Sequence, residues 1–418
     1  MASEKVLMGI DIGSSWVRAV VGSVSRDGQL MVDSVCERQS DGIRNGNIVN
    51  LELALKAIAS VKQEAELQAG AEAQSVICNI GGASIEGVTS IGVAGISAKD
   101  MGISYGDISK SIGLAREYAK DSLLTADRQI IHTLIQDYIV DGKAGIRDPL
   151  DMSGHRLESR VIVVSSDGAT YGNIQRCMQR MGLSQCRIIT SQVADSEVVL
   201  NSDDKELGTI LINIGSDTTD IIAYKNGYPC FLGGVAFGSD NVTSDIAYLL
   251  NRPRAYSEQV KIDHGCCYEP SVSDADMVIL PGTPGSPNVE LPRKELAKIA
   301  EARMAEIFAL LYKMLDEKCH GMSFNGGVVL VGGGSLLSGA CELAHEIFGL
   351  PTRIGFPEAL PGLDRLYIDP RYTTVLGLIK FEVGKSASRG KTSTTAVKHN
   401  AGKKGFLNKI SDYIKTII

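Results

Sequence analysis

The chain of 418 residues is 44% hydrophobic and 22% charged, a composition typical of globular proteins with several domain-sized units. Its formal net charge of −7 leaves no strongly basic globular surface, so we expect no nucleic-acid partner. The nine cysteines form no CxxC pair, which argues against a cysteine-based zinc motif and indicates a reducing cytosol. Glu4 and Asp11 near the start do not fit a signal peptide, and no run approaches the roughly 18 apolar residues of a membrane span.

The first predicted element is a β-hairpin at residues 7–22, LMGIDIGSSWVRAVVG. Two strand-like apolar runs flank a short turn of glycine and serine, and such a turn exposes backbone N–H groups. It can approach a phosphate closely, although a single copy fits an ordinary hairpin better. The residues that would face a phosphate are Gly13, Ser14 and Ser15.

A small α/β unit is predicted next. Residues 85–95 and 132–142 have the character of β-strands, and residues 108–120 have helical periodicity. The unit supplies no nucleotide-binding loop, so we expect it to serve contact between copies of the chain, with a lineage-specific decoration as the alternative.

Residues 209–223, TILINIGSDTTDIIA, repeat the pattern of the first hairpin when Gly215 is aligned with Gly13. Two copies about 200 residues apart suggest two related halves that close on one polyphosphate. The second loop consists of Gly215, Ser216, Asp217 and Thr218.

Residues 328–340, VVLVGGGSLLSGA, predict a buried strand, a triple-glycine turn and the start of a helix. The turn would let an adenosine lie against backbone, or it is only a glycine-rich connection. It is neither a P-loop, since no GK[ST] follows the glycines, nor a GxGxxG fingerprint at the head of a βαβ unit.

Beyond Gly384 the composition changes. Residues 384–404 are polar and basic, which predicts a flexible linker. Residues 405–418, GFLNKISDYIKTII, have helical amphipathic spacing, and at 1.5 Å per residue this helix of about 20 Å would lie in a membrane interface and not cross it. The alternative is a last helix packed on the protein itself. The apolar face is formed by Phe406, Leu407, Ile410, Tyr413, Ile414, Ile417 and Ile418.

The order of two hairpin loops and a triple-glycine loop is similar to that of the actin, Hsp70 and sugar-kinase ATPase superfamily. Within it, residues 238–250 and 257–267, together with 152–166, resemble the FtsA family of bacterial cell-division proteins. The resemblance covers residues 5 to 383 and the tail. It implies an α/β, actin-like duplicated ATPase fold with two lobes around a nucleotide cleft, an inserted small α/β subdomain and a C-terminal amphipathic helix.

The resemblance also implies the domain organisation. The first large subdomain takes residues 1–81, 161–195 and 350–383, and the inserted small subdomain takes residues 82–160. The second large subdomain takes residues 196–240 and 311–349, and its small satellite takes residues 241–310. The basic linker and the membrane-targeting helix follow at residues 384–404 and 405–418.

By the same resemblance the cofactors are ATP and magnesium. Asp11 would hold magnesium through water, since magnesium needs few direct protein ligands. Glu258 and Lys261 would reach the ribose and adenine, or they are only a surface ion pair three residues apart on a helix. The complete set is Asp11, Gly13, Ser14, Ser15, Gly215, Ser216, Asp217, Thr218, Glu258, Lys261, Gly333, Gly334 and Ser335.

One position departs from the superfamily pattern. Asn213 stands where an aspartate is usual, and an amide can carry no charge to a metal and cannot act as a base. Asp217 offers a carboxylate at a shifted position that would restore the charge. We therefore assign no catalytic residue and expect ATP binding with at most slow hydrolysis.

The function implied is an ATP-binding actin-like protein that polymerises, tethers FtsZ filaments to the inner face of the cytoplasmic membrane and recruits later division proteins to the septum. The expected partners are the FtsZ C-terminal peptide, further copies of the chain, later division proteins and anionic lipid. Arg293 and Arg303 of the satellite would pair with acidic side chains of the peptide, or they are two solvated arginines.

Three alternatives remain on the same fold. A sugar or carboxylate kinase would need a base and a sugar pocket, and neither has a motif. A chaperone ATPase would need a substrate-binding domain after the adenosine loop, where fewer than about 90 residues remain. A pilus-assembly ATPase-like protein is the nearest rival adaptor, but such proteins do not end in this tail.

Overall fold

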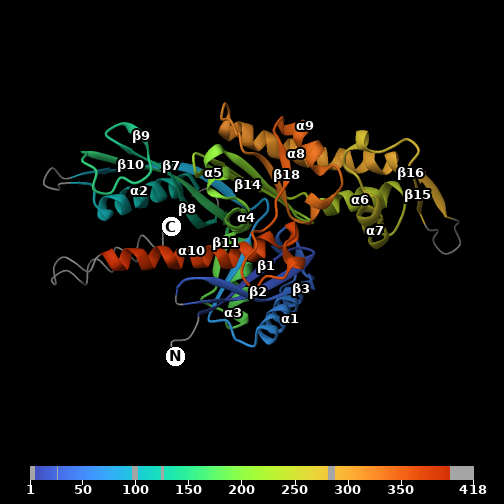
Figure 1. Cartoon of the computed structure of the whole chain (residues 1–418), viewed down its shortest axis with the longest axis horizontal. Coiled ribbons are helices and arrows are strands. Elements are labelled where there is room, and N and C mark those ends of the chain that lie inside the picture. The colour runs from blue at the N-terminus through green and yellow to red at the C-terminus, as the bar shows by residue number, and fades with distance from the viewer. Residues whose placement is uncertain (1–4, 26, 97–101, 124–126, 281–287, 396–418) are drawn as a thin grey trace.

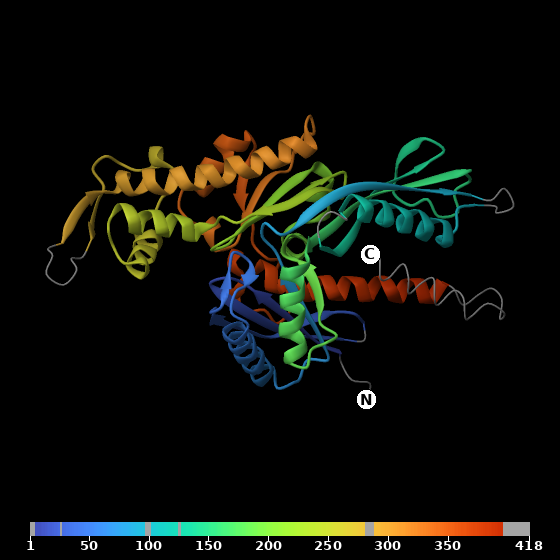
Figure 2. The same ribbon diagram turned by 180° about the vertical axis from the view of Figure 1, so that it is seen from behind.

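The computed structural model describes residues 5–25, 27–96, 102–123, 127–280 and 288–395. Two large five-stranded sheets form two lobes, and two smaller units extend from them toward opposite ends of the long axis (Figure 1). The unit at one end is the inserted subdomain, and the unit at the other end is the satellite (Figure 2).

The two large sheets have the same topology. In each, an antiparallel three-stranded meander is extended by two parallel strands. This match confirms the duplication predicted from the paired glycine loops. The first sheet has the strand order β11 (Arg187–Thr190), β6 (Ser75–Ile80), β1 (Lys5–Ile12), β2 (Trp16–Val24) and β3 (Leu30–Gln39). The second sheet has the strand order β18 (Thr352–Ile354), β17 (Gly327–Val331), β12 (Thr209–Ile214), β13 (Thr219–Lys225) and β14 (Tyr228–Val235).

Two helices, α4 (Ser191–Val199) and α10 (Thr373–Thr395), pack on one another between the sheets. Their contact is close because Gly377 has no side chain: a Cβ there would lie 1.9 Å from the carbonyl oxygen of Ala194. α10 also contacts β1 and β2, whereas α4 contacts β12 and β13. The helix pair therefore connects the cores of the two lobes.

Helix α1 (Leu51–Ala69) covers the first sheet with α3 (Gly168–Arg180) beside it. α1 begins at Asn50, whose side chain accepts a hydrogen bond from Leu53 N, and it ends at Gly70 in the left-handed conformation. Its buried side chains recur at helical spacing, which gives one face to the core. These are Ala54, Ile58, Val61 and Ala65.

The second lobe and the satellite share one hydrophobic core, in which the long helix α8 contributes to both. A two-stranded ribbon, β15 with β16, ends the satellite, and short 3-10 turns connect several elements. The bounds are α5 (Ser202–Leu207), α6 (Ser239–Leu249), α7 (Arg254–His264), η1 (Glu269–Ser271), β15 (Met277–Leu280), β16 (Val289–Pro292), α8 (Arg293–Cys319), η2 (Gly333–Leu336), α9 (Ala340–Phe348), η3 (Arg365–Tyr367) and η4 (Pro370–Tyr372).

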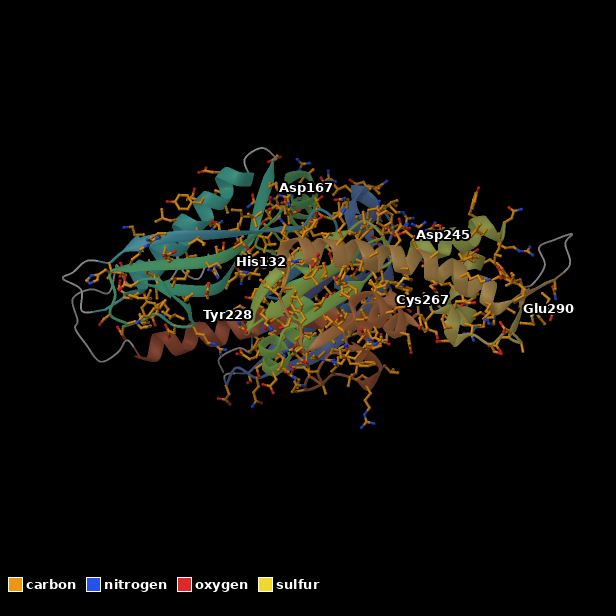
Figure 3. All side chains as sticks on the ribbon, turned by 90° about the horizontal axis from the view of Figure 1, so that it is seen from above. His132, Asp167, Tyr228, Asp245, Cys267 and Glu290 are labelled. Carbon is orange, nitrogen blue, oxygen red and sulfur yellow. The ribbon has the colours of Figure 1, made fainter. Side chains whose placement is uncertain are left out.

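The inserted subdomain is the predicted α/β unit. Its antiparallel sheet has the order β7 (Glu86–Gly95), β10 (Arg156–Asp167), β8 (Arg128–Val140), β9 (Lys143–Ile146), and α2 (Tyr105–Leu123) packs on β7 and β10. β10 continues past the predicted boundary at residue 160. His132 of β8 accepts a hydrogen bond from Thr190 N at the edge of the first sheet, near the middle of the molecule (Figure 3).

The end of the chain differs from the expectation. α10 continues to Thr395, so it overlaps the first part of the linker predicted at residues 384–404. Extending an existing helix requires no new nucleus, and this stretch has no proline to end it. The predicted amphipathic segment 405–418 lies outside the described residues. In the described part of the chain, none of the helices combines the length and apolar character needed to cross a membrane.

Candidate functional site

A cavity of about 600 Å³ lies between the two lobes. Both predicted hairpin loops and the triple-glycine turn line it, together with helix α7 of the satellite. The structure thus brings together residues that are more than 300 positions apart in the sequence. All predicted nucleotide-binding residues except Asp217 and Ser335 line this cavity: Asp11, Gly13, Ser14, Ser15, Gly215, Ser216, Thr218, Glu258, Lys261, Gly333 and Gly334.

The two hairpin turns have the same local geometry. Gly13 N donates to Trp16 O at 3.2 Å, and Gly215 N donates to Thr218 O at 2.9 Å. A Cβ at Gly13 would lie 2.6 Å from Trp16 O, and one at Gly215 would lie 2.9 Å from Thr218 O. Only glycine fits either turn, so each loop presents bare backbone and short hydroxyl side chains to the cavity.

The triple-glycine turn packs directly against the second loop. A Cβ at Gly332 would lie 2.2 Å from Asn213 Oδ1, and one at Gly334 would lie 2.3 Å from Ile214 Cγ2. Ser335 is buried and donates to Gly332 O at 2.7 Å, so it holds the turn in shape and does not face the cavity. Gly333 is the open position, because a Cβ there would meet only Arg371 Cγ, at 3.8 Å.

Glu258 and Lys261 of α7 form the ion pair that their spacing allows, with 2.7 Å between Lys261 Nζ and Glu258 Oε2. Lys261 Nζ also donates to Ser239 O at 3.1 Å, and Thr243 Oγ1 donates to Glu258 Oε2. Lys261 is buried, and both residues line the cavity. The pair is therefore part of the cavity wall, with the Lys261 side chain buried and the Glu258 side chain 42% exposed.

Three carboxylates are buried in or behind the cavity wall, and burial raises the pKa of each: Asp11 and Asp220 line the cavity, and Asp195 lies behind Asn213. Asp11 accepts from Asn79 Nδ2 at 2.7 Å, and burial raises its pKa although Arg18 opposes the shift. Burial raises the pKa of Asp195 to about 6 and that of Asp220 to about 7. The nearby charge of Asp11 adds to both shifts.

The buried carboxylate of Asp195 explains why position 213 holds an asparagine and not the usual aspartate. Asn213 Nδ2 donates to Asp195 Oδ2 at 2.7 Å and to Thr374 Oγ1 at 3.2 Å. The other oxygen of Asp195 accepts from Thr373 and Thr374 at 2.8 Å each. A carboxylate at 213 would face Asp195 with like charge, whereas the amide supplies the donor that the position needs.

Asp220, on β13 of the second lobe, forms hydrogen bonds to residues outside its own sheet. Its Oδ1 accepts from Gly82 N at 2.7 Å and from Gln192 Nε2 at 2.8 Å. Gln192 Oε1 is buried and has no hydrogen-bond partner within the described residues, so it can accept from water. Sequence reasoning missed Asp195, Asp220 and Gln192, because their partners lie far away in the chain and no local motif marks them.

Asp217 is turned away from the cavity. Its Oδ2 accepts from Asn45 N at 3.0 Å, across the gap between the lobes. The suggestion that Asp217 restores the charge lost at Asn213 therefore has no support from its position. Asp11 is the carboxylate that lines the cavity beside the first loop.

The lining fits a magnesium nucleotide chemically. Bare glycine backbone and hydroxyls suit phosphate oxygens, and carboxylate oxygens suit a hydrated magnesium ion. Within the described residues, no group of three or more His, Cys, Asp or Glu side chains is arranged to enclose a metal. A metal here would depend on Asp11, water and the phosphates themselves.

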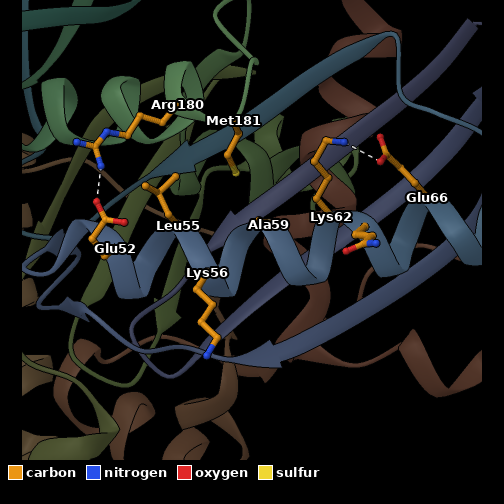
Figure 4. Close-up of a pocket in the computed structure, with 9 residues that line it drawn as sticks. Glu52, Leu55, Lys56, Ala59, Lys62, Glu66, Arg180 and Met181 are labelled. Atoms are coloured by element: carbon orange, nitrogen blue, oxygen red, sulfur yellow. Dashed lines mark hydrogen bonds and ion pairs between the residues drawn. The ribbon is translucent and has the colours of Figure 1, made fainter.

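A second hollow of similar volume lies between α1 and α3 (Figure 4). Its charged side chains pair with one another: Arg180 with Glu52 at 2.5 Å and Lys62 with Glu66 at 2.6 Å. No glycine loop reaches it, and it is shallow and open. The cavity between the lobes is therefore the stronger candidate site.

The two predicted partner-binding arginines have different surroundings. Arg293 begins α8, lines the cavity and donates from Nε to His264 O at 3.0 Å. Arg303 forms two hydrogen bonds with Asp245 of α6, at 2.7 and 3.1 Å, and pairs with Glu306. Asp245 lies in the satellite half of the molecule (Figure 3). A peptide would have to compete with Asp245 for Arg303.

Comparison with known proteins gives consistent results. A family profile described as "Cell division protein FtsA" matches residues 210–377, and one described as "SHS2 domain inserted in FTSA" matches residues 82–165. The chain is 36% identical to the cell division protein FtsA of Pseudomonas aeruginosa, over 92% of this chain and 91% of that protein. It is 34% identical to that of Borreliella burgdorferi, over 91% of each, and 29% identical to that of Escherichia coli K12, over 90% of each.

Solved structures share the fold at low sequence identity. A chain of the PilM-PilN type IV pilus biogenesis complex superposes with a TM-score of 0.61 at 14% identity, over 92% of this chain and 99% of that one. MreB5 of Spiroplasma citri bound to AMPPNP superposes with a TM-score of 0.54 at 14% identity, over 93% and 99%. These similarities confirm the predicted actin-like ATPase fold.

Proposed function

The chain belongs to the family of the cell division protein FtsA, and from this premise we propose that it binds ATP with magnesium in the cavity between its lobes and links FtsZ filaments to the inner face of the cytoplasmic membrane. The site of action is the division septum, as the family implies. The proposal includes self-association into filaments and recruitment of later division proteins.

The observation that carries the nucleotide proposal is the pair of hairpin turns that face one cavity, one from each lobe. Each turn presents glycine backbone and hydroxyls, and together they can hold a chain of phosphates from two sides. The glycine turn and α7 border the same cavity, which leaves room there for a nucleoside. The fold neighbour MreB5 was solved with AMPPNP, an ATP analogue, which supports the same ligand class.

Slow turnover is the expected kinetic behaviour. Asn213 supplies no charge at the position that is usually acidic, and it is already engaged with Asp195. Asp220 Oδ1 already accepts hydrogen bonds from Gly82 N at 2.7 Å and from Gln192 Nε2 at 2.8 Å. Asn213 cannot act as a general base, and this oxygen of Asp220 is engaged within the protein. ATP then acts mainly as a structural ligand that closes the lobes.

The partner proposals concern the two ends of the molecule. The inserted subdomain and the satellite lie at opposite ends of the long axis, so one subunit can contact the next end to end (Figure 1). The satellite, with Arg293 at the start of α8 and Arg303 further along the same helix, is the proposed docking site for the acidic C-terminal peptide of FtsZ. Such a contact would be steered by charge and weakened by salt.

The membrane proposal rests on the pattern of residues 405–418, an apolar face of Phe, Leu, Tyr and Ile side chains opposite a polar face with Lys409 and Lys415. Burial of that face contributes on the order of 5–10 kcal/mol before the cost of ordering the segment. Each lysine adds about 1 kcal/mol against anionic lipid. One tail therefore binds weakly, and a filament with many tails binds firmly.

Isothermal titration of Mg-ATP into the purified protein tests the nucleotide proposal. We expect saturable binding to wild type and none to Gly333→Asp, because that change places a negative charge at the open position of the glycine turn without a backbone clash. Gly172→Ala is the matched control, since a Cβ there meets nothing within 4 Å. Absence of ATP binding to wild type would refute the proposal, and phosphorylation of an added sugar would favour the kinase alternative.

A further inference from the structure

A short hairpin, β4 (Ile43–Arg44) with β5 (Asn47–Ile48), turns beside the cavity. The two turn residues, Asn45 and Gly46, have φ values of 50° and 74°, which are typical of a type I′ turn. Ile43 and Ile48 are 1% and 8% exposed and belong to the core of the first lobe. The hairpin is therefore anchored in the first lobe, with its turn held at a fixed place.

The turn contacts both phosphate loops. Asn45 N donates to Asp217 Oδ2 of the second lobe at 3.0 Å, and Gly46 N donates to Ser14 Oγ of the first loop at 3.4 Å. Gly46 itself lines the cavity. A Cβ at Gly46 would lie 3.1 Å from Gly81 O and 3.5 Å from Thr218 Cγ2. The turn thus lies where the two loops approach one another.

The two hydrogen bonds differ in strength. The bond to Asp217 has ordinary length and a charged acceptor, so it holds the turn against the second loop. The bond from Gly46 N to Ser14 Oγ is long, and this N–H can exchange it for a stronger bond to an anionic oxygen in the cavity. A phosphate group positioned between the two hairpin loops would present such an oxygen.

We propose that the Asn45–Gly46 turn is a third phosphate-binding loop and that Asp217 is its positioning residue, so that the site distinguishes a nucleoside triphosphate from a diphosphate. This inference rests on the proposed binding of ATP. Asp217 touches the turn and does not line the cavity, and its contribution is to keep Gly46 N in place when the lobes close on the terminal phosphate. A diphosphate, which lacks that group, does not need the third loop.

The test compares the affinities of Mg-ATP and Mg-ADP by calorimetry. In Asp217→Ala we expect the affinity for ATP to fall about tenfold, as for the loss of one charge-assisted hydrogen bond, while the affinity for ADP stays within about twofold. Asp217→Asn keeps an acceptor oxygen and should restore most of the discrimination. Asp203→Ala, an exposed aspartate on α5, is the matched control and should bind both nucleotides as wild type does.

Gly46→Ala gives a second, independent variant, because its Cβ would crowd Gly81 O and the positive φ disfavours alanine. It should also lose affinity for ATP selectively. Equal losses for ATP and ADP, or no loss in either variant, would overturn the third-loop proposal. A wild-type protein that binds neither nucleotide would instead refute the proposed function, so the two failures are distinguishable.

Discussion

Asn213 shows how a single residue can depart from a superfamily pattern for a reason that only the folded chain reveals. Its amide donates to Asp195, a carboxylate that is 18 positions earlier in the chain and completely buried. The sequence identified the substitution but not its cause, since nothing near Asn213 marks Asp195 as its neighbour. The amide preserves a hydrogen bond in a place where a second carboxylate would be repelled.

Asn213→Asp should therefore destabilise the protein. Two carboxylates would meet in a buried site, which costs on the order of 3 kcal/mol when both are ionised. Denaturant unfolding at pH 8 without nucleotide would measure the loss, and it should shrink below pH 6, where one carboxyl is protonated. An unchanged free energy of unfolding at pH 8 would contradict the assigned pairing.

Asp220→Asn should have the opposite effect. The pKa of Asp220 is raised by burial from 3.8 to about 7 in the folded protein, so the folded state binds a proton that the unfolded state loses at lower pH. Wild type therefore loses stability as pH rises through this window, by on the order of 4 kcal/mol at about 1.4 kcal/mol per pH unit. The asparagine variant escapes this loss and keeps the acceptor for Gly82 N.

Denaturant unfolding of wild type and Asp220→Asn across pH 4 to 8 would measure the difference between their free energies of unfolding. We expect this difference to grow in favour of the variant from pH 4 to about pH 7 and then to level off. Asp203→Asn, at an exposed position, is the control and should show no such trend. A variant less stable than wild type at pH 8 would mean that the ionised carboxylate is stabilising in place.

Elements were easier to predict from the sequence than the contacts between them. The two hairpins, the strand and turn at 328–340 and the α/β insertion are all present, because glycine turns and alternating apolar residues are local signals. The buried carboxylates Asp195 and Asp220 were not predicted, because their surroundings depend on which elements the topology brings together. The predicted start of the linker at residue 384 was wrong, because α10 continues to Thr395. A polar composition does not by itself end a helix.

The inserted subdomain also cannot be removed cleanly. On its strand β8, His132 accepts from Thr190 N at the edge of the first sheet, and Gln136 donates to Pro229 O of the second lobe. Ile85 belongs to the large core cluster, so deleting residues 82–160 would expose that core. A surface substitution is the better test of its proposed role in self-association. Tyr118 on α2 is 54% exposed and points to solvent.

Tyr118→Glu should abolish filaments on lipid, because it places a charge in the proposed contact, while the affinity for ATP stays unchanged. Electron microscopy on anionic lipid monolayers with Mg-ATP would show the result. Leu67→Glu, on the exposed face of α1 in the first lobe, is the control and should leave filaments intact. Normal filaments from Tyr118→Glu would remove this helix from the contact.

For the whole molecule, the proposal joins three activities in one chain: nucleotide binding between the lobes, end-to-end assembly and attachment by the tail. Each would be weak in isolation. Under the proposed function, assembly would multiply the membrane tails, and nucleotide-dependent closure would control assembly. Membrane attachment should then depend on ATP.

Co-sedimentation of FtsZ with anionic liposomes tests the central claim most directly. With Mg-ATP, wild type should carry FtsZ into the vesicle pellet. Ile414→Glu, with a charge in the middle of the predicted apolar face, should leave both proteins in the supernatant while it still binds ATP. FtsZ that stays in the supernatant with wild type, or that pellets equally with Ile414→Glu, would contradict the account.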